Sequence, residues 1–248
     1  MLRPITILIL IFFIVSCEND KALNKIKLST LIEPNFTHNL DLFNCSLNKD
    51  LSLISLESFF SNNSNKYSIL TKSDKLTVSV LFPENTTSVK NFLISVSSKA
   101  NHIGVKNFID EIKSDGFDNI ANCSFAIYQN KALDLISNLD LLNKNGFINI
   151  EILRCSYNDG YNFGTFQISV NRFINNIKKL DSAYSISFVE DNSFNHDFVW
   201  INSFYDRDYQ SNLIKNWINQ KDAIEIKDEF NENATCIDAK KYKGYNLY

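Results

Sequence analysis

The stretch Asn39–Ser46, NLDLFNCS, decides the fold, because it recurs as Asn149–Ser156, NIEILRCS, at a spacing of 110 residues (149 − 39 = 110). In both copies apolar residues alternate with polar ones ahead of a cysteine, which predicts a strand with one buried face. The tripeptide KAL precedes both copies, at 21–23 and 131–133, and the run LTVSVLF at 76–82 is answered by FVWINSF at 198–204. We therefore predict that the chain holds two copies of one structural unit.

Hydrophobic periodicity predicts the same order of elements in each copy: strand, helix, two strands, helix, strand. In the first copy we expect strands at 38–45, 66–71, 76–82 and 122–128, helices at 51–60 and 87–99, and a further helical piece at 105–113. In the second copy we expect a connecting helix at 131–142, strands at 147–155, 184–190, 198–204 and near 235–239, and helices at 165–179 and from 209 onward.

This order of elements is the split βαβ pattern of ferredoxin-like units, which leaves one face of each sheet bare. Two such units packed sheet to sheet resemble the dimeric α/β-barrel superfamily, fused here into one α+β chain. The expected divisions are a signal peptide at 1–16, a tether at 17–37, a first ferredoxin-like unit at 38–129, and a second unit with its connecting helix at 130–248. Two separate α+β domains that do not close a barrel are the alternative.

The composition excludes some classes of function. The chain has 248 residues and a formal net charge of −3, so it lacks the dense basic face that nucleic-acid binding requires. The three histidines, His38, His102 and His196, are not spaced as metal ligands, and no glycine-rich phosphate loop occurs. We therefore expect no metal site, no cofactor and no nucleic-acid partner. The oligomeric state stays open.

The N-terminus resembles that of bacterial lipoproteins. Arg3 precedes the apolar run 7–15, and Ile14-Val15-Ser16-Cys17 is similar to a lipobox. The resemblance implies cleavage before Cys17, alkylation of its thiol with a diacylglycerol that carries palmitate-type chains, and a lipid anchor on a membrane, facing the periplasm or the cell exterior. An uncleaved anchor or a plain secretory signal is the alternative, and the sequence leaves inner and outer membrane open.

Four cysteines remain if Cys17 carries the lipid, an even set in an oxidising compartment. In a ferredoxin-like sheet of order 4-1-3-2, the end of the first strand lies beside the start of the fourth. The resemblance therefore implies two disulfides, Cys45–Cys123 and Cys155–Cys236. Four free thiols or a pairing between the two copies are the alternatives.

The candidate ligand site lies in the second copy. Trp200 and Asn202 share a face of one predicted strand with Phe198 and Phe204, and Glu151 lies on the adjoining strand. Dimeric α/β barrels hold small aromatic ligands or haem between their sheets, so the resemblance implies a cleft lined by Trp200, Asn202 and Glu151. The alternative is that Trp200 and Trp217 are core aromatics between helix and sheet.

The sequence around this site also resembles secreted proteins of marine bacteria whose function is uncharacterised. The resemblance rests on Phe198-Val-Trp-Ile-Asn followed by Asp208 and Trp217, with Cys155-Ser-Tyr-Asn-Asp-Gly ahead. Because no catalytic constellation stands out, the leading hypothesis is a lipid-anchored protein that binds a small ligand or a partner without catalysis. The alternatives are a cofactor-poor enzyme of the α/β-barrel kind, monooxygenase- or isomerase-like, and a structural subunit of the envelope.

Overall fold

The computed structural model describes residues 33–84, 89–99, 102–136, 148–180, 184–193, 195–205 and 209–248. The predicted signal peptide, Cys17 and most of the tether lie outside these residues. The described strands form a single sheet of order β3-β2-β9-β6-β8-β7-β5-β1-β4, and an additional pairing of β3 with β1 closes it into a barrel. The strands are β1 (His38–Leu47), β2 (Leu76–Pro83), β3 (Asn91–Ser98), β4 (Ala121–Cys123), β5 (Lys131–Ile136), β6 (Ile148–Tyr157), β7 (Tyr184–Glu190), β8 (Phe198–Phe204) and β9 (Ala234–Asn246).

The two halves of the chain order their strands in the same way. The first half reads β4-β1-β3-β2 and the second reads β9-β6-β8-β7, which is the order 4-1-3-2 in both. The halves meet where β2 pairs with β9, and where β5 pairs with β1 on one side and β7 on the other. The result is a mixed α+β fold built around one closed sheet.

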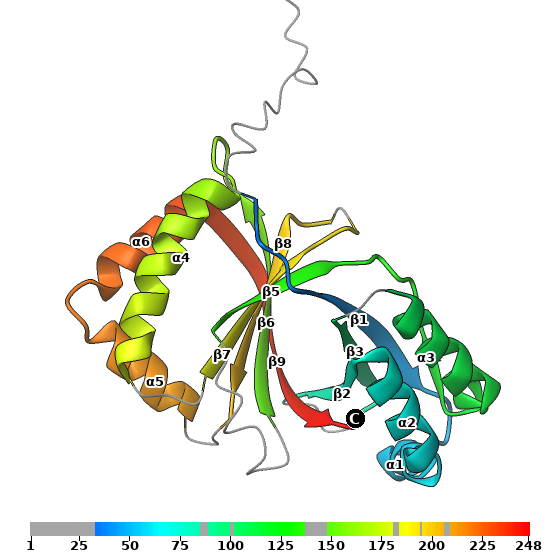
Figure 1. Cartoon of the computed structure of the whole chain (residues 1–248). Helices are drawn as coiled ribbons and strands as arrows, with labels where there is room; N and C mark the ends of the chain where they lie inside the picture. Colours follow the sequence, from blue (N-terminus) through cyan, green and yellow to red (C-terminus); the bar gives the residue numbers. More distant parts are fainter. Residues whose placement is uncertain are drawn as a thin grey trace, which may run out of the picture.

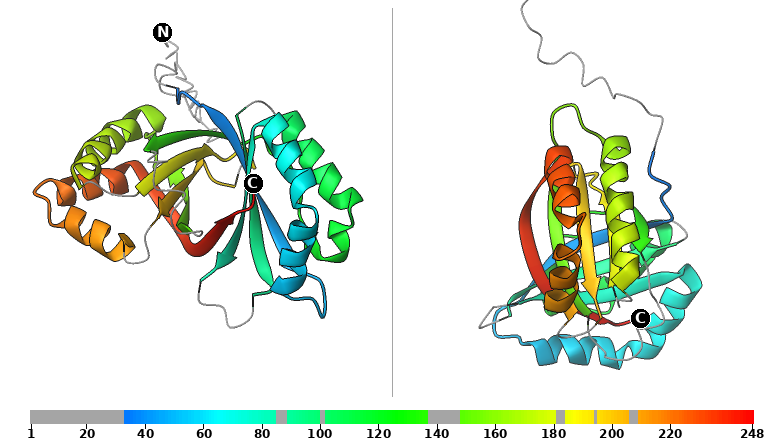
Figure 2. Two further views of the ribbon diagram at one scale, coloured as in Figure 1. Left: turned by 60° about the horizontal axis from the view of Figure 1, so that its bottom comes forward. Right: turned by 90° about the vertical axis from the view of Figure 1, so that its left-hand side faces the viewer.

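Helices cover the sheet from outside on two opposite sides (Figures 1 and 2). Those of the first half are α1 (Leu53–Asn62), α2 (Ser64–Asp74) and α3 (His102–Ser114), and those of the second are α4 (Phe163–Ile177), α5 (Tyr209–Ile218) and α6 (Ala223–Asn233). Short 3₁₀ turns follow α3 at Phe117–Asn119 and α4 at Lys178–Leu180. Among the described residues, no helix is both long and apolar enough to cross a bilayer.

The interior of the barrel is a packed apolar core. Side chains from strands of both halves fill it, and alternate residues of the same strands point outward to the helices. The buried members are Leu40, Leu81, Leu93, Ala132, Ile152, Val189, Val199, Ile201 and Tyr242.

Three predicted elements are wrong, and a fourth, the strand expected at 122–128, already ends at Cys123. Residues 66–71 belong to helix α2, not to a strand, since Tyr67 and Thr71 are buried one helical turn apart. Residues 91–98 form strand β3 within the predicted helix 87–99. The predicted connecting helix begins as strand β5, and its remainder lies outside the described residues.

The misassignment of strand β3 has a physical cause. A strand with both faces covered loses its alternation of apolar and polar residues, so its periodicity no longer distinguishes it from a buried helix. In β3, Phe92, Ile94 and Val96 pack toward the helices while Leu93 faces the barrel interior. Helix α6 was missed altogether.

These corrections change which strands correspond. Strand β8 is the third strand of its half, so its counterpart is β3 and not β2. The strand register supports the match of β8 with β3. Glu151 of β6 lies opposite Asn202 of β8, and Asp41, which corresponds to Glu151, lies opposite Val96 of β3. By the same register Trp200 corresponds to Ile94. The sequence comparison had matched it with Val78, which is therefore wrong.

The structure contains both predicted disulfides. Cys45 joins Cys123 between β1 and β4, and Cys155 joins Cys236 between β6 and β9, with Cα–Cα distances of 4.1 and 4.0 Å. Each pair lies directly opposite across two antiparallel strands, which is the consequence of the 4-1-3-2 order. The inner cysteines, Cys45 and Cys155, are buried beneath the helices.

Candidate functional site

Strand β8 separates two environments. Val199 and Ile201 point into the barrel interior, whereas Trp200 and Phe204 point outward into the core beneath α4, α5 and α6. The predicted cleft between the sheets is therefore wrong in position: the interior is solid, and Trp200 lies in the layer between helices and sheet.

A hydrogen-bonded group of four side chains sits in this layer, and we call it the amide cluster: Glu151, Tyr184, Trp200 and Asn202. The Asn202 amide oxygen accepts two hydrogen bonds, from the Tyr184 hydroxyl at 2.6 Å and from the Trp200 indole Nε1 at 2.7 Å. The Asn202 amide nitrogen donates to Glu151 Oε2 at 3.1 Å. The structure thus brings together all three predicted site residues and adds Tyr184.

Burial fixes the protonation state on which this arrangement depends. Tyr184 is 1% exposed, and Asn202 and Trp200 are each 8% exposed. Burial, with the charge of Glu151 as a smaller cause, raises the pKa of Tyr184 far above its usual value, so its hydroxyl remains a donor. Two donors on the Asn202 oxygen settle which way the amide points, and its nitrogen must then face Glu151.

Aromatic rings pack around Trp200. Phe166, Phe173 and Phe230 lie 6.0, 6.5 and 6.0 Å from it between ring centroids, in tilted or edge-on contacts. Trp217 of α5 packs edge-on against Phe173 at 5.0 Å, and its buried Nε1 has no hydrogen-bond partner among the residues that the structure describes. The alternative that Trp200 and Trp217 are core aromatics therefore describes their packing correctly.

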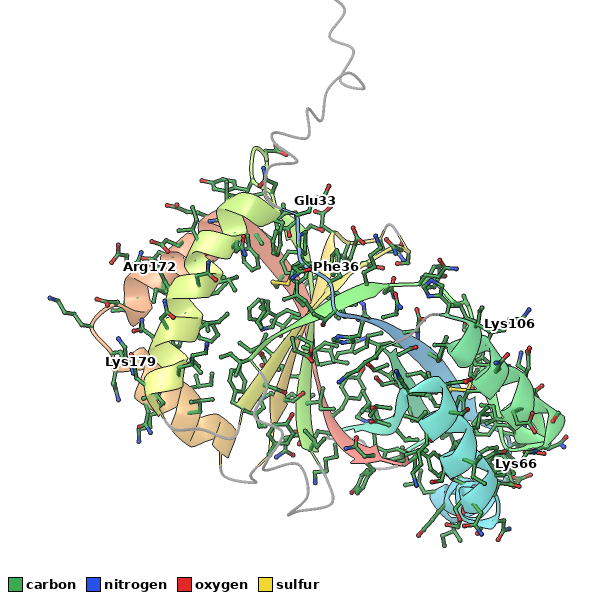
Figure 3. All side chains as sticks on the ribbon, viewed as in Figure 1. Glu33, Phe36, Lys66, Lys106, Arg172 and Lys179 are labelled. Atoms are coloured by element: carbon green, nitrogen blue, oxygen red, sulfur yellow. A yellow bond between two sulfur atoms is a disulfide. The ribbon has the colours of Figure 1, made fainter. Side chains whose placement is uncertain are left out.

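Ion pairs join helices α4 and α6 on the side that faces away from the sheet. Arg172 of α4 forms ion pairs with Glu225 and Glu229 of α6. Its label in Figure 3 marks the solvent side of α4, away from the sheet. The pairs hold the two helices together above the amide cluster.

The first half shows that the fold does not require the amide cluster. Register places Leu76, Ile94 and Val96 at the positions of Tyr184, Trp200 and Asn202. All three are buried and apolar. The two halves share only an acidic residue among the four positions of the cluster, since Asp41 occupies the position of Glu151. Because buried polar groups cost free energy unless fully paired, their restriction to one half points to a role there beyond packing.

Glu151 connects the cluster with the surface. It is half-buried and lies opposite Lys241 across the β6–β9 ladder. A shallow surface depression lies close to this point of the ladder, and its enclosed volume is about 0 Å³, whereas ligand sites typically enclose ~300–1,000 Å³. Its lining residues are Glu84, Asn149, Ile150, Phe204, Lys241 and Tyr242.

Tyr184 is the cluster residue that sequence reasoning missed. Its strand was predicted with the correct bounds, yet pairing with Asn202 depends on the register of β7 against β8, which one strand alone does not reveal. The histidines are elsewhere: His38 on β1, His102 at the start of α3, and His196 between β7 and β8. Within the described residues, no group of three or more His, Cys, Asp or Glu side chains could hold a metal ion.

Haem, which the superfamily resemblance implied, does not fit this layer. An axial ligand would have to be His, Cys, Met or Tyr. No histidine lies on α4–α6 or β6–β9, both cysteines are in a disulfide, and Met1 is the only methionine of the chain. Burial raises the pKa of Tyr157 and Tyr184 and disfavours the phenolate that iron would need.

Comparison with known proteins gives structural likeness alone. No family model matches the sequence, and no curated protein matches it. A variant of chlorite dismutase from Candidatus Nitrospira defluvii, in complex with cyanide, has a TM-score of 0.57 at 6% identity and covers 86% of this chain and 93% of its own. A proposed monooxygenase from Lactobacillus acidophilus has a TM-score of 0.54 at 7% identity, covering 85% and 95%. A proposed monooxygenase from Fusobacterium nucleatum has a TM-score of 0.52 at 12% identity, covering 87% and 94%.

These neighbours correct the leading functional hypothesis. A protein that binds a ligand or partner without catalysis was expected because no catalytic constellation was visible in the sequence. The similar structures are instead named as a chlorite dismutase and as monooxygenases, which favours the enzyme alternative. The chain shares the fold of this chlorite dismutase and of these two proposed monooxygenases.

Proposed function

We propose that this protein is an enzyme of the monooxygenase-like α/β-barrel kind and that its reaction takes place at the amide cluster. The observation that carries the proposal is the asymmetry between the halves. The same strand positions hold Tyr184, Trp200 and Asn202 in one half and plain apolar residues in the other. The names of the structural neighbours support the class of reaction.

The cluster offers chemistry for a substrate that supplies its own electrons. Glu151 is a candidate general base, held by the Asn202 amide nitrogen at 3.1 Å. It would take a proton from an acidic C–H or O–H group, and the resulting anion would reduce O₂. In the simplest balance, R₂CH₂ + O₂ gives R₂C=O + H₂O, with one oxygen atom in the product and the other in water. An isomerase would use the same base without consuming O₂.

An oxygen electrode tests this activity. Purified protein is incubated with a panel of phenols, hydroquinones and activated methylene compounds, without added metal or flavin. We expect saturable O₂ uptake with at least one compound, lowered on the order of a hundredfold or more by Glu151→Gln. The matched control is Asp134→Asn, which removes a carboxylate of β5 that bonds Ser187 instead. No uptake with any compound, or equal rates for wild type and Glu151→Gln, would contradict the proposal.

We also propose that the halves are two copies of one ferredoxin-like unit, at 38–129 and 130–248, packed as an intramolecular dimeric barrel. The repeated NLDLFNCS-type strand, the common strand order and the matching disulfides support this. The packed barrel interior supports a second candidate function, a purely structural subunit of the envelope. Absence of turnover together with stable incorporation into an envelope complex would favour it.

Lipid anchoring at Cys17 completes the proposal, supported by Ile14-Val15-Ser16-Cys17 after an apolar run. We expect Cys17→Ser to leave the precursor unprocessed or to move the protein from the membrane to the soluble fraction, because the acyl chains supply the anchor. Cell fractionation and intact mass measure both outcomes. Unchanged mass and fractionation in the variant would rule out lipidation.

A further inference from the structure

The first long helical segment differs between the two halves. The repeat spacing of 110 residues aligns the start of α1 with the start of α4 (163 − 53 = 110). Helix α4 then continues unbroken to Ile177, whereas the first half has two helices, α1 and α2, which are separated at Asn63. Phe173 occupies the corresponding position inside α4 (173 − 63 = 110). The first half therefore has a helix end where the second half has none.

This helix end exposes carbonyl groups of α1. The last four C=O groups of a helix have no donor within the helix and take one from elsewhere. The side-chain amide of Asn63 donates to the Phe59 carbonyl oxygen at 2.9 Å, and the main-chain N–H of Asn63 donates to that of Ser61. The carbonyl oxygen of Phe60, between them in sequence, accepts from the Tyr248 hydroxyl at 2.9 Å. A side chain that follows the last strand of the second half thus completes the end of α1.

The ring of Tyr248 packs on an aromatic wall of the first half. Its centroid lies 5.9 Å from that of Tyr67, in an edge-on contact. Tyr67 is fully buried, and its hydroxyl donates at 2.8 Å to Asp115, which also accepts from Lys66 at 2.7 Å. The wall is therefore held from behind. Burial raises the pKa of Tyr248, so its hydroxyl stays protonated and acts as a donor.

The segment that carries this ring lies at the end of the β2–β9 ladder, on the side of α1 and α2 (Figure 1). The Leu247 N–H donates to the Val78 carbonyl at 2.8 Å, and the Val78 N–H donates to the Tyr248 carbonyl at 2.9 Å. The side chains of Leu247 and Tyr248 are only partly buried against the first-half core. Because the end of a ladder opens at a lower free energy than its middle, 247–248 can leave β2 while the rest of β9 stays paired.

We propose that the Phe60 carbonyl and the Tyr67 ring form a binding site for phenols, which Tyr248 occupies as an internal ligand and from which an external phenol displaces it. The ligand class follows from the contacts, since the acceptor takes a hydroxyl donor and the ring edge takes an aromatic face. An external phenol competes with a tethered one, whose effective concentration is on the order of millimolar. The inference goes beyond the proposed function and does not depend on it.

Calorimetric titration of the full-length Tyr248→Ala variant with 4-methylphenol, the equivalent of the tyrosine side chain, tests the site. We expect saturable binding with a Kd on the order of 1 mM. Toluene has the same ring without the hydroxyl. It is expected to bind at least about fivefold more weakly, because it leaves the Phe60 carbonyl without a donor. The wild type is expected to bind 4-methylphenol about tenfold more weakly than the variant, since Tyr248 competes from within the chain.

The matched control is Tyr245→Ala, which removes a ring of the same segment that packs on Phe82 at 5.9 Å. This variant is expected to bind 4-methylphenol no more tightly than the wild type. Three results would each overturn the proposal: no saturable binding to Tyr248→Ala, equal affinity of that variant for toluene, or equally tight binding of 4-methylphenol by Tyr245→Ala.

Hydrogen exchange in the wild type tests displacement without any substitution. Saturating 4-methylphenol is expected to speed exchange of the Val78 and Leu247 amides about threefold or more, because the main-chain bonds that these amides make are released. Residues 235–237, at the disulfide-linked start of β9, are expected to keep their rates. If Tyr248→Ala does not fold, this measurement decides alone. Unchanged exchange at both amides, or acceleration along the whole of β9, would overturn the proposal. Neither measurement involves O₂ or turnover, so its failure is distinct from failure of the proposed reaction.

Discussion

Replacing Cys155 and Cys236 together by alanine is expected to lower the free energy of unfolding by about 4 kcal/mol. The crosslink closes a loop with a sequence separation of 81 residues, and in the chain-entropy model the stabilisation increases with the logarithm of that length. Because Cys155 is fully buried beneath the helices, loss of its packing adds to the effect. Urea unfolding with and without the crosslink measures the difference.

The first-half disulfide provides the matched control for this experiment. Cys45–Cys123 spans 78 residues between the corresponding strands, so its removal is expected to cost the same within about 1 kcal/mol. Two losses of similar size would agree with equivalent crosslinks in two equivalent units. A loss below about 1 kcal/mol for either pair would contradict the view that these crosslinks stabilise the fold.

Asn202→Leu is expected to destabilise the protein by about 2–6 kcal/mol. The substitution leaves the Tyr184 hydroxyl and the Trp200 indole N–H buried without their acceptor, and each stranded donor costs roughly 1–3 kcal/mol. The matched variant is a triple substitution, Tyr184→Phe, Trp200→Phe and Asn202→Leu, which removes the donors together with the acceptor. It is expected to recover most of the loss, since an apolar replacement of a buried polar group is often neutral.

This pair of variants tests whether the amide cluster behaves as one network. The expected result is strong non-additivity, with the triple variant more stable than the single one by denaturant unfolding. The contrary result is additivity, in which the free energy of unfolding of the triple variant falls by the sum of the losses of its three single substitutions. That result would mean that the cluster supports the core of the second half. The absence of the cluster from the first half would then have another cause.

The sequence predicted the parts of the fold that depend on local pattern. Strands β7 and β8 have the bounds expected from their apolar runs, and the repeated cysteine strand led to both disulfides. The prediction from sequence failed for strand β3, both faces of which are buried. Strand β3 packs Ile94 on the helices and Leu93 in the barrel, so its spacing imitated a helix.

The candidate site was predicted only as a set of residues. Trp200, Asn202 and Glu151 do meet, but on the helix side of the sheet. The sequence of one strand does not show which of its faces points into the barrel, because this depends on its pairing with strands distant in the sequence. The place of Tyr184 in the cluster depends on a contact with Asn202 on a different strand.

The central claim is that the amide cluster is retained for chemistry and not for stability. The most direct measurement is O₂ uptake by the triple variant Tyr184→Phe, Trp200→Phe and Asn202→Leu, with the compound on which the wild type is active. The account predicts a folded variant, with both disulfides formed and cooperative unfolding, and with O₂ uptake at the level of the buffer alone. A folded triple variant that consumes O₂ at the wild-type rate would contradict the account.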